Sequence, residues 1–460
     1  MSENADNILL NKKHIHFIGI GGSGMFPLAQ ILKSEGYFLT GSDNNETDTL
    51  KMVRALGIPV IMGQKAENIQ GADLIVHTAA IMDDNEELVA AKNSGIAVIE
   101  RSILLGIITA RYKNTICVSG THGKTTTSSM LTQILLDTGC DPTAVIGGKL
   151  PAIGGNGRAG KSETMVCEAC EFVNTFLQLS PDVSIILNID EDHMDFFKTM
   201  DRLIASFHKF CTLTSKTIIA NGDDPQVYVA LQNIDKEIIT FGYANDNDYY
   251  PMNIVFHKGE IHTSYDLMKG TQLLGQIDIF VPGKHNVLNS IAAVVAALNS
   301  GVAFDKVKNA IANFKGAGRR FELLGKINGI TVVDDYAHHP TEMKVTLEAA
   351  KNMNFNRVIA VHQPFTYSRT KMHLDYFAEV LKIADKTVLS EIMGSREKNI
   401  YNIYSKDLCD KIDKAVWFNT FEEIADYVVD FAKEGDLVIT MGCGDIYKAA
   451  KLILAKLAGE

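Results

Sequence analysis

No apolar run in the 460-residue chain approaches the roughly 20 residues that a membrane-spanning helix needs. The opening residues 1–6 carry no basic stretch and precede no long apolar core, so we expect no secretory signal. Positive charge is also scarce, since 44 Lys and Arg stand against 55 Asp and Glu and the net charge is −11. This balance argues against a broad surface for nucleic acid or anionic membrane. We therefore expect no nucleic-acid partner and no membrane insertion.

Cysteine is sparse and unpatterned, with seven residues at positions 117, 140, 167, 170, 211, 409 and 443. An odd, scattered set in a chain of this length predicts free thiols in a reducing compartment. Cys167 and Cys170 form one C-x-x-C motif, but no second ligand pair follows at suitable spacing. That absence argues against a zinc or redox site. The sequence therefore predicts a cytoplasmic protein.

Strand-like and helix-like segments alternate along the chain, which predicts an α/β fold, and the length suggests about three domains. Residues 1–111 are expected to form a Rossmann-like domain, because the strand at 14–19 leads through a glycine turn into a helix and further strands. Residues 112–315 are expected to form a central ATPase domain of the phosphate-loop type with a mostly parallel sheet. Residues 316–460 are expected to form a second Rossmann-like α/β domain.

Hydrophobic patterning also places individual elements in the second and third domains. Strands are expected at 164–168, 183–189, 330–333, 358–361, 387–389 and 437–440, with an antiparallel meander between about 243 and 281 and a helix over Val287–Leu298.

The most informative segment is GTHGKTTT at residues 120–127, which follows an apolar run and precedes a helical pattern. A glycine-rich turn between strand and helix presents backbone N–H groups and the helix dipole to an anion. Lys124 supplies a cation for the outer phosphates, and the Thr125 hydroxyl suits Mg²⁺. The loop is two residues shorter than the common G-x-x-x-x-G-K-[ST] pattern, which disfavours a conventional motor or transport ATPase. We predict a nucleoside triphosphate site at Gly120, Thr121, His122, Gly123, Lys124, Thr125 and Thr126.

A second glycine motif, GIGGSG at residues 19–24, matches G-x-G-x-x-G, and Asp43 follows its last glycine by 19 residues. Such a loop holds a diphosphate on a helix N-terminus, and the diphosphate belongs either to NAD or to a UDP-sugar. The ATP loop favours the UDP-sugar, because a dehydrogenase needs no ATP. We assign the UDP-sugar to Gly19, Gly21, Gly22, Ser23, Gly24, Met25, Ser42, Asp43, His77 and Thr78.

Acidic residues follow two of the predicted central strands. Glu168 ends one strand, and the run NIDEDHMD at residues 188–195 follows another. The ends of parallel strands meet at the edge of an open α/β sheet, which is where such folds bind ligands. Carboxylates beside a triphosphate suit Mg²⁺, although a solvated acidic turn is the alternative interpretation.

The loop GTHGKT resembles the ATP loop of the Mur ligases, which build the peptidoglycan stem peptide. The segments GKHNVLN at 283–289, GAGRRFE at 316–322 and DDYAHHPTE at 334–342 resemble three further family motifs. The resemblance extends over nearly the whole chain. It implies two Mg²⁺ ions held by Thr125, Glu168 and His193. It also implies ATP contacts from His285, Asn286, Asn289, Arg320, Asp334 and Asp335, with Asn286 alternatively serving as a helix N-cap.

Three segments, at residues 19–25, 335–340 and 362–370, are most similar to the family member that adds the first amino acid. The resemblance thus implies ATP-driven joining of L-alanine to the lactyl carboxylate of UDP-N-acetylmuramate by a monomer or homodimer. The alternatives are a ligase that attaches a whole tripeptide to the same UDP-sugar and a binding protein without catalysis. The implied catalytic residues are Lys124, Glu168, His193, Arg320 and His338, and the implied substrate contacts are Tyr336, His338 and Arg369.

The chain departs from the family pattern at a few positions near these motifs. Cys170 stands where Asp is frequent, and Asp190 with Glu191 replaces the frequent Glu-Pro. Phe365 and Thr366 stand where His and Arg are common, so we expect Arg369 to carry more of the positive charge near the substrate.

Overall fold

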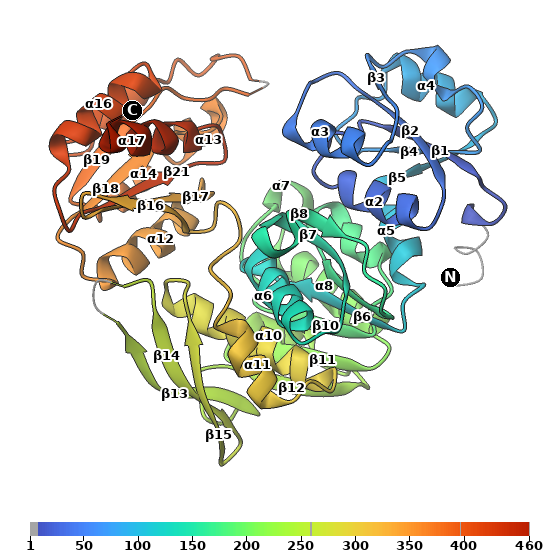
Figure 1. Ribbon diagram of the computed structural model, residues 1–460, viewed down its shortest axis with the longest axis horizontal. Helices are drawn as coiled ribbons and strands as arrows, with labels where there is room; N and C mark the ends of the chain where they lie inside the picture. The colour runs from blue at the N-terminus through green and yellow to red at the C-terminus, as the bar shows by residue number, and fades with distance from the viewer. Residues whose placement is uncertain (1–7, 258–259, 396, 460) are drawn as a thin grey trace. The chain divides into compact units, whose positions relative to one another are not determined.

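The computed structural model describes residues 8–257, 260–395 and 397–459. The opening residues, whose sequence argues against a secretory signal, lie outside this part. The described chain contains three β-sheets, coloured blue, green to yellow, and orange to red along the sequence in Figure 1. It divides into two compact units, one of residues 1–251, 267–275 and 288–311 and one of residues 252–266, 276–287 and 312–460. The predicted fold class of three α/β domains is confirmed by these sheets.

The N-terminal sheet has five parallel strands in the order β3-β2-β1-β4-β5. Its strands are β1 (His14–Ile18), β2 (Phe38–Asp43), β3 (Val60–Met62), β4 (Leu74–His77) and β5 (Ala97–Glu100). Its helices are α2 (Phe26–Ser34), α3 (Asp48–Ala55), the 3-10 helix η1 (Ala66–Ile69), α4 (Glu86–Asn93) and α5 (Arg101–Thr109). The order reverses between β1 and β4, and such a switch point is where doubly wound sheets bind ligands.

The central sheet has ten strands in the order β15-β14-β13-β12-β11-β10-β6-β9-β7-β8. Its strands are β6 (Asn114–Ser119), β7 (Thr143–Leu150), β8 (Gly155–Arg158), β9 (Thr164–Glu168), β10 (Val183–Ile186), β11 (Thr217–Asn221), β12 (Glu237–Phe241), β13 (Tyr249–Phe256), β14 (Thr263–Lys269) and β15 (Gln272–Ile279). The accompanying helices are α6 (Lys124–Asp137), η2 (Pro151–Ile153), η3 (Phe172–Gln178), α7 (Met194–Phe197), α8 (Met200–Leu213), α9 (Pro225–Ala230), α10 (Lys284–Asn299) and α11 (Phe304–Ile311). Strands β13, β14 and β15 are successive neighbours, as expected of a meander.

Two predicted boundaries in this region are wrong by three residues. Strand β10 ends at Ile186 rather than at residue 189, because Leu187 and Asn188 turn towards the glycine-rich loop after β6 and bond its backbone. Helix α10 begins at Lys284 rather than at Val287, which places Asn286 inside its first turn. The Asn286 amide donates to the carbonyl of Pro282 at 2.7 Å, so this residue is not the N-cap.

The C-terminal sheet has six strands in the order β16-β17-β21-β18-β19-β20, parallel except where β16 pairs with β17. Its strands are β16 (Glu322–Ile327), β17 (Ile330–Asp335), β18 (Val358–His362), β19 (Lys386–Leu389), β20 (Val416–Trp417) and β21 (Leu437–Met441). Its helices are α12 (Pro340–Asn352), α13 (Tyr367–Met372), α14 (Leu374–Leu381), α15 (Ser405–Cys409), α16 (Phe421–Phe431) and α17 (Tyr447–Ala458).

Local sequence accounts for many of these elements. The strands that lie inside the sheets are short apolar runs, as parallel strands covered on both faces require, and Ile116, Cys117 and Val118 of β6 are completely buried. Several helices begin at a polar residue whose side chain accepts a hydrogen bond from the first turn. Such caps are Thr47, Asn85, Thr199, Asp224 and Thr420.

Close packing of α5 on the central domain depends on a glycine. A Cβ atom added to Gly106 would lie 2.1 Å from the carbonyl oxygen of Gln178 in η3. Because backbone must move to admit a methyl group, we expect Gly106→Ala to lower the free energy of unfolding by about 2–3 kcal/mol, measured by urea denaturation. Ile103→Ala, on the exposed side of the same helix, is the control and should cost clearly less. Equal stabilities of the two variants would contradict this prediction.

Candidate active site

The glycine-rich loop after β6 has the shape of an anion cradle. Gly123 precedes α6 with a φ of 87°, a conformation that favours glycine, and a Cβ there would lie 2.5 Å from Oδ1 of Asn289. Asn188 holds the loop from the other side, since its Oδ1 accepts from the His122 amide at 2.8 Å and its Nδ2 donates to the His122 carbonyl at 3.0 Å. The sequence reasoning did not assign Asn188, although it is the first residue of the acidic run.

The loop is also joined to Asp190, one of the departures from the family pattern. The backbone N–H of Asp190 donates to Thr121 Oγ1 at 2.9 Å, and its carboxylate lies 3.5 Å from the His122 ring. The backbone of Asp190 therefore joins the acidic run to the glycine-rich loop. Thr126 lies half-buried in the first turn of α6.

Lys124 is largely buried, with 13% of its side chain exposed, and makes an ion pair with a carboxylate. Its Nζ lies 2.9 Å from Glu171 Oε2 and donates to the carbonyls of Gly120 and Thr121 at 2.5 and 3.0 Å. Burial acts to lower the pKa of Lys124, but Glu171, Cys170 and Glu168 together outweigh it, so the pKa lies above the ordinary value of lysine. The ammonium is therefore charged at neutral pH and already oriented by the loop.

Glu171 is a second residue of this site, after Asn188, that the sequence reasoning did not assign. Its side chain is 1% exposed, and it belongs with Asp192 and His193 to a group whose ligand atoms all lie within 4.8 Å of one another. The ring of His193 also packs on Phe172 at 4.6 Å between centroids. His193 has a φ of 54°, a left-handed conformation that aims its side chain at this group.

The predicted metal ligands fall into two neighbouring sets. Thr125 Oγ1 donates to Glu168 Oε1 at 3.1 Å, and Glu168 Oε2 accepts from the Gly147 amide at 2.8 Å. His193 is grouped instead with Glu171 and Asp192. Carboxylate and hydroxyl oxygens predominate among these donors, and this donor chemistry fits Mg²⁺.

The predicted UDP-sugar residues gather at the C-terminal edge of the N-terminal sheet. The Gly21 amide donates to Asp43 Oδ2 at 2.9 Å, and the Gly19 amide donates to the carbonyl of Ser42 at 2.9 Å. A Cβ on Gly19 would lie 2.7 Å from Cγ2 of Thr78, so the loop packs directly on the end of β4. Gly22, Ser23 and Gly24 complete the turn, and His77 ends β4 beside it.

Two residues of this set have side chains that lie inside the domain. Met25 is completely buried in the hydrophobic core. The Ser42 hydroxyl is also completely buried and donates to Glu87 Oε2 at 2.6 Å, while Glu87 Oε1 lies 2.7 Å from His16. The side chains of Ser42 and Met25 therefore lie beneath the glycine turn.

The predicted ATP residues of the C-terminal domain include two buried carboxylates. Asp334 accepts from Arg319 Nε at 2.8 Å and from the Thr440 hydroxyl at 2.5 Å, and burial raises its pKa. Asp335 accepts from the backbone N–H groups of Phe321 and Ala337, both at 2.7 Å. Asp334 therefore holds the Arg319 side chain, whereas Asp335 fixes the backbone around the RRF segment.

Arginine and aromatic side chains lie beside these carboxylates. The guanidinium of Arg320 packs over the Tyr336 ring at 5.2 Å, and His338 Nδ1 lies 3.3 Å from Glu342. Burial lowers the pKa of His338, which Glu342 offsets only in part, so the imidazole is neutral at pH 7. Nη1 of Arg369 is buried and has no hydrogen-bond partner among the described residues. His285 is exposed, whereas Asn286 and Asn289 are buried.

Burial raises the pKa of Asp335 from 3.8 to about 6. The folded protein therefore binds more protons than the unfolded chain between these values, and stability falls as pH rises through this window. We expect wild type to lose stability relative to Asp335→Asn between about pH 4 and pH 6, measured by urea denaturation across this range. A stability difference between the two proteins that is independent of pH would contradict the assignment.

Comparison with known proteins identifies the family of the chain. Three family models match the chain: the Mur ligase family, catalytic domain at residues 14–113, the Mur ligase middle domain at 118–297 and the Mur ligase, glutamate ligase domain at 319–444. The chain belongs to the Mur ligase family. The predicted resemblance is thereby confirmed.

Relatives of this Mur ligase align along almost its whole length. It is 42% identical over 448 residues to UDP-N-acetylmuramate--L-alanine ligase of Caldanaerobacter subterraneus subsp. tengcongensis, covering 96% of this chain and 97% of that one. It is 44% identical over 450 residues to the protein of the same name from Agathobacter rectalis, covering 96% and 98%. Among solved structures, UDP-N-acetylmuramate-alanine ligase of Thermotoga maritima superposes with a TM-score of 0.82 at 26% identity, covering 98% and 100%.

A murein peptide ligase from Psychrobacter arcticus superposes on this Mur ligase with a TM-score of 0.72 at 25% identity, covering 97% and 99%.

None of the helices in the described part of the chain combines the length and apolar sequence that a membrane crossing needs.

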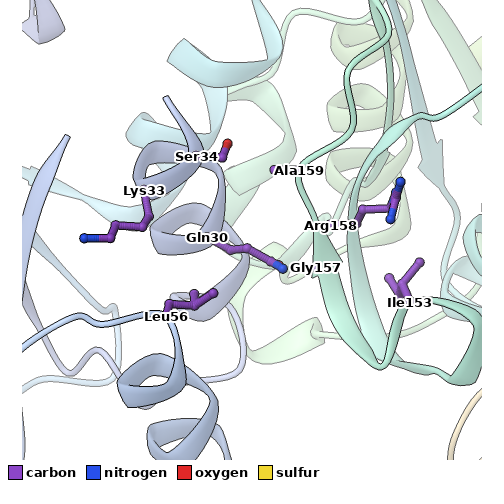
Figure 2. A pocket seen from close by; sticks show the side chains of 8 residues that line it. All are labelled: Gln30, Lys33, Ser34, Leu56, Ile153, Gly157, Arg158 and Ala159. Atoms are coloured by element: carbon purple, nitrogen blue, oxygen red, sulfur yellow. The ribbon is translucent and has the colours of Figure 1, made fainter. Parts of the chain in front are cut away.

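Figure 2 shows a depression of about 320 Å³ between α2 and the β7–β8 hairpin of this Mur ligase. Gln30 extends towards Gly157, while Lys33 points away from the hairpin. The lining residues are Gln30, Lys33, Ser34, Leu56, Ile153, Gly157, Arg158 and Ala159. None of them belongs to the predicted site.

Proposed function

We propose that this Mur ligase joins L-alanine to the lactyl carboxylate of UDP-N-acetylmuramate at the expense of ATP, as a step of peptidoglycan precursor synthesis in the cytoplasm. One observation carries the proposal: relatives named UDP-N-acetylmuramate--L-alanine ligase align over 96% of the chain at 42–44% identity. The charged Lys124 in its phosphate loop supports an activity that consumes ATP.

The reaction proceeds through activation of a poor electrophile. A lactyl carboxylate oxygen attacks the γ-phosphorus of ATP, the bond to the β,γ-bridging oxygen breaks, and an acyl phosphate and ADP form. The amino group of L-alanine then attacks the acyl carbon, loses a proton and expels inorganic phosphate. In the first step the protein mainly positions the reactants and neutralises charge, which is the role of Lys124 and Arg320.

Mg²⁺ supplies charge neutralisation for the phosphates when bound. Thr125, Glu168 and His193 are the proposed ligands, and the grouping of Glu171 and Asp192 with His193 adds two carboxylates to them. Two ions match the two neighbouring sets of donors. In the chain itself, Glu168 holds the Thr125 hydroxyl and the Gly147 amide in place.

The remaining roles follow from the chemistry of the side chains. The glycine turn at residues 19–24, with Asp43, His77 and Thr78, binds the UDP-sugar, and the loop at 120–126 binds the phosphates of ATP together with Asn289. Tyr336, neutral His338 and the partly unpartnered Arg369 orient the substrate and amine.

The proposed domains are residues 1–111, 112–315 and 316–460. We further propose that the protein is a monomer or homodimer, which light scattering tests directly.

Phosphate release tests this proposal. MgATP and UDP-N-acetylmuramate are supplied with L-alanine in one reaction and with the stem tripeptide in another. We expect phosphate with L-alanine only. Phosphate only with tripeptide would reassign the chain to the activity of the murein peptide ligases. No phosphate release in either reaction would contradict the assignment as a ligase. It would favour the alternative of a nucleotide-binding protein without catalysis.

A further inference from the structure

Arg101 lies against the glycine turn of the N-terminal domain. It is the first residue of α5 and follows the C-terminal end of β5, at the same sheet edge as the turn that follows β1. A Cβ atom added to Gly24 would lie 2.9 Å from Nη1 and 3.2 Å from Cζ of Arg101. The guanidinium therefore covers the last glycine of the turn, and a side chain at that position would displace it.

The guanidinium of Arg101 has no counter-ion among the residues that the structure describes. Its side chain is half-buried, yet it makes no hydrogen bond or ion pair with any residue that the structure describes. Two other arginines of the domain are paired, Arg54 with Glu46 and Arg111 with Glu35. A cation held out of bulk water without a counter-charge loses free energy, so its position favours an external anion.

The acidic residue that contacts the turn, at the end of β2, does not supply that counter-charge. Asp43 accepts hydrogen bonds from the backbone N–H groups of Gly21 and Asn45. The turn itself is held by the central domain, because Asn156 Nδ2 donates to the carbonyl of Ser23 at 2.7 Å. The backbone of the turn and the guanidinium thus face each other in a fixed arrangement.

We propose that Arg101 binds an anionic oxygen of the UDP-sugar, namely of the diphosphate seated on the glycine turn. This inference rests on the proposed function. Arginine presents a planar fork of donors that pairs with two anionic oxygens at once, which lysine does not. Backbone N–H groups of the turn hold one side of the diphosphate and Arg101 holds the other.

Calorimetric titration of the full-length protein tests this assignment with four probes: uridine, UDP, UDP-N-acetylglucosamine and UDP-N-acetylmuramate. We expect Arg101→Ala to weaken UDP binding about 10- to 100-fold and to leave uridine binding unchanged. Arg101→Lys should recover only part of the loss. Arg54→Ala removes a paired surface arginine of the same domain and should bind all probes as wild type does.

The pattern of losses identifies the group that is bound. Equal losses for UDP and both UDP-sugars support the diphosphate. A loss confined to UDP-N-acetylmuramate would shift the contact to its lactyl carboxylate and overturn the diphosphate assignment. If wild type binds UDP and Arg101→Ala binds every probe as tightly as wild type does, the role of Arg101 is overturned but the proposed function is not. Wild type that binds neither UDP nor a UDP-sugar would overturn this inference and the proposed function together.

Discussion

Replacing Lys124 by alanine lowers kcat/KM of the alanine-dependent reaction by about 10³-fold, because the variant lacks the cation that stabilises the transferring phosphoryl group. The same change leaves the Glu171 carboxylate buried without its partner. Breaking a buried ion pair costs about 3 kcal/mol of stability, so Lys124→Ala should also unfold at lower urea. Steady-state kinetics and urea denaturation measure the two effects separately.

A second substitution separates catalysis from folding. Glu171→Gln in the Lys124→Ala background removes the uncompensated charge, and we expect stability to recover while activity stays low. Lys113→Ala is the matched control, since Lys113 pairs with Glu163 at the surface and should be dispensable for both properties. If activity recovers together with stability in the double variant, Lys124 serves the fold rather than the reaction.

Replacing Glu168 by glutamine lowers kcat about 10²-fold and raises the Mg²⁺ concentration for half-maximal rate about 10-fold. The carboxylate already receives hydrogen bonds from Thr125 and Gly147, so it is oriented for a cation, and an amide binds Mg²⁺ more weakly than a carboxylate does. Activity is measured against MgCl₂ at fixed excess ATP.

Glu163→Gln, directly before the first residue of β9, is the control for the loss of one carboxylate. Glu163 is exposed and pairs only with Lys113 in the part of the chain described, so its Mg²⁺ dependence should equal that of wild type. An unchanged Mg²⁺ dependence in Glu168→Gln would remove Glu168 from the proposed ligands.

The elements that sequence predicts well are those with strong local signals. The glycines of both loops mark tight turns between a strand and a helix, and the apolar runs mark strands such as β1, β6 and β21, which the structure confirms. The start of α10 was placed late because Lys284 and His285 interrupt the apolar pattern of the helix, although neither prevents helix formation.

The residues that sequence reasoning did not assign depend on tertiary packing. Glu171 reaches Lys124 across 47 positions of the chain, and nothing in its neighbourhood marks that pairing. The backbone after it turns through left-handed conformations at Val173 and Asn174, which a β-branched residue rarely adopts. Arg101 meets Gly24 only because β1 and β5 end at the same sheet edge. Local patterns carry no information on such contacts.

The central claim, that ATP activates the lactyl carboxylate, is tested most directly by following oxygen. UDP-N-acetylmuramate labelled with ¹⁸O in that carboxylate is converted with ATP and L-alanine, and the released phosphate is analysed by mass spectrometry. An acyl phosphate intermediate leaves one carboxylate oxygen on the phosphate, so we predict ¹⁸O-labelled phosphate. Unlabelled phosphate released during product formation would contradict the mechanism.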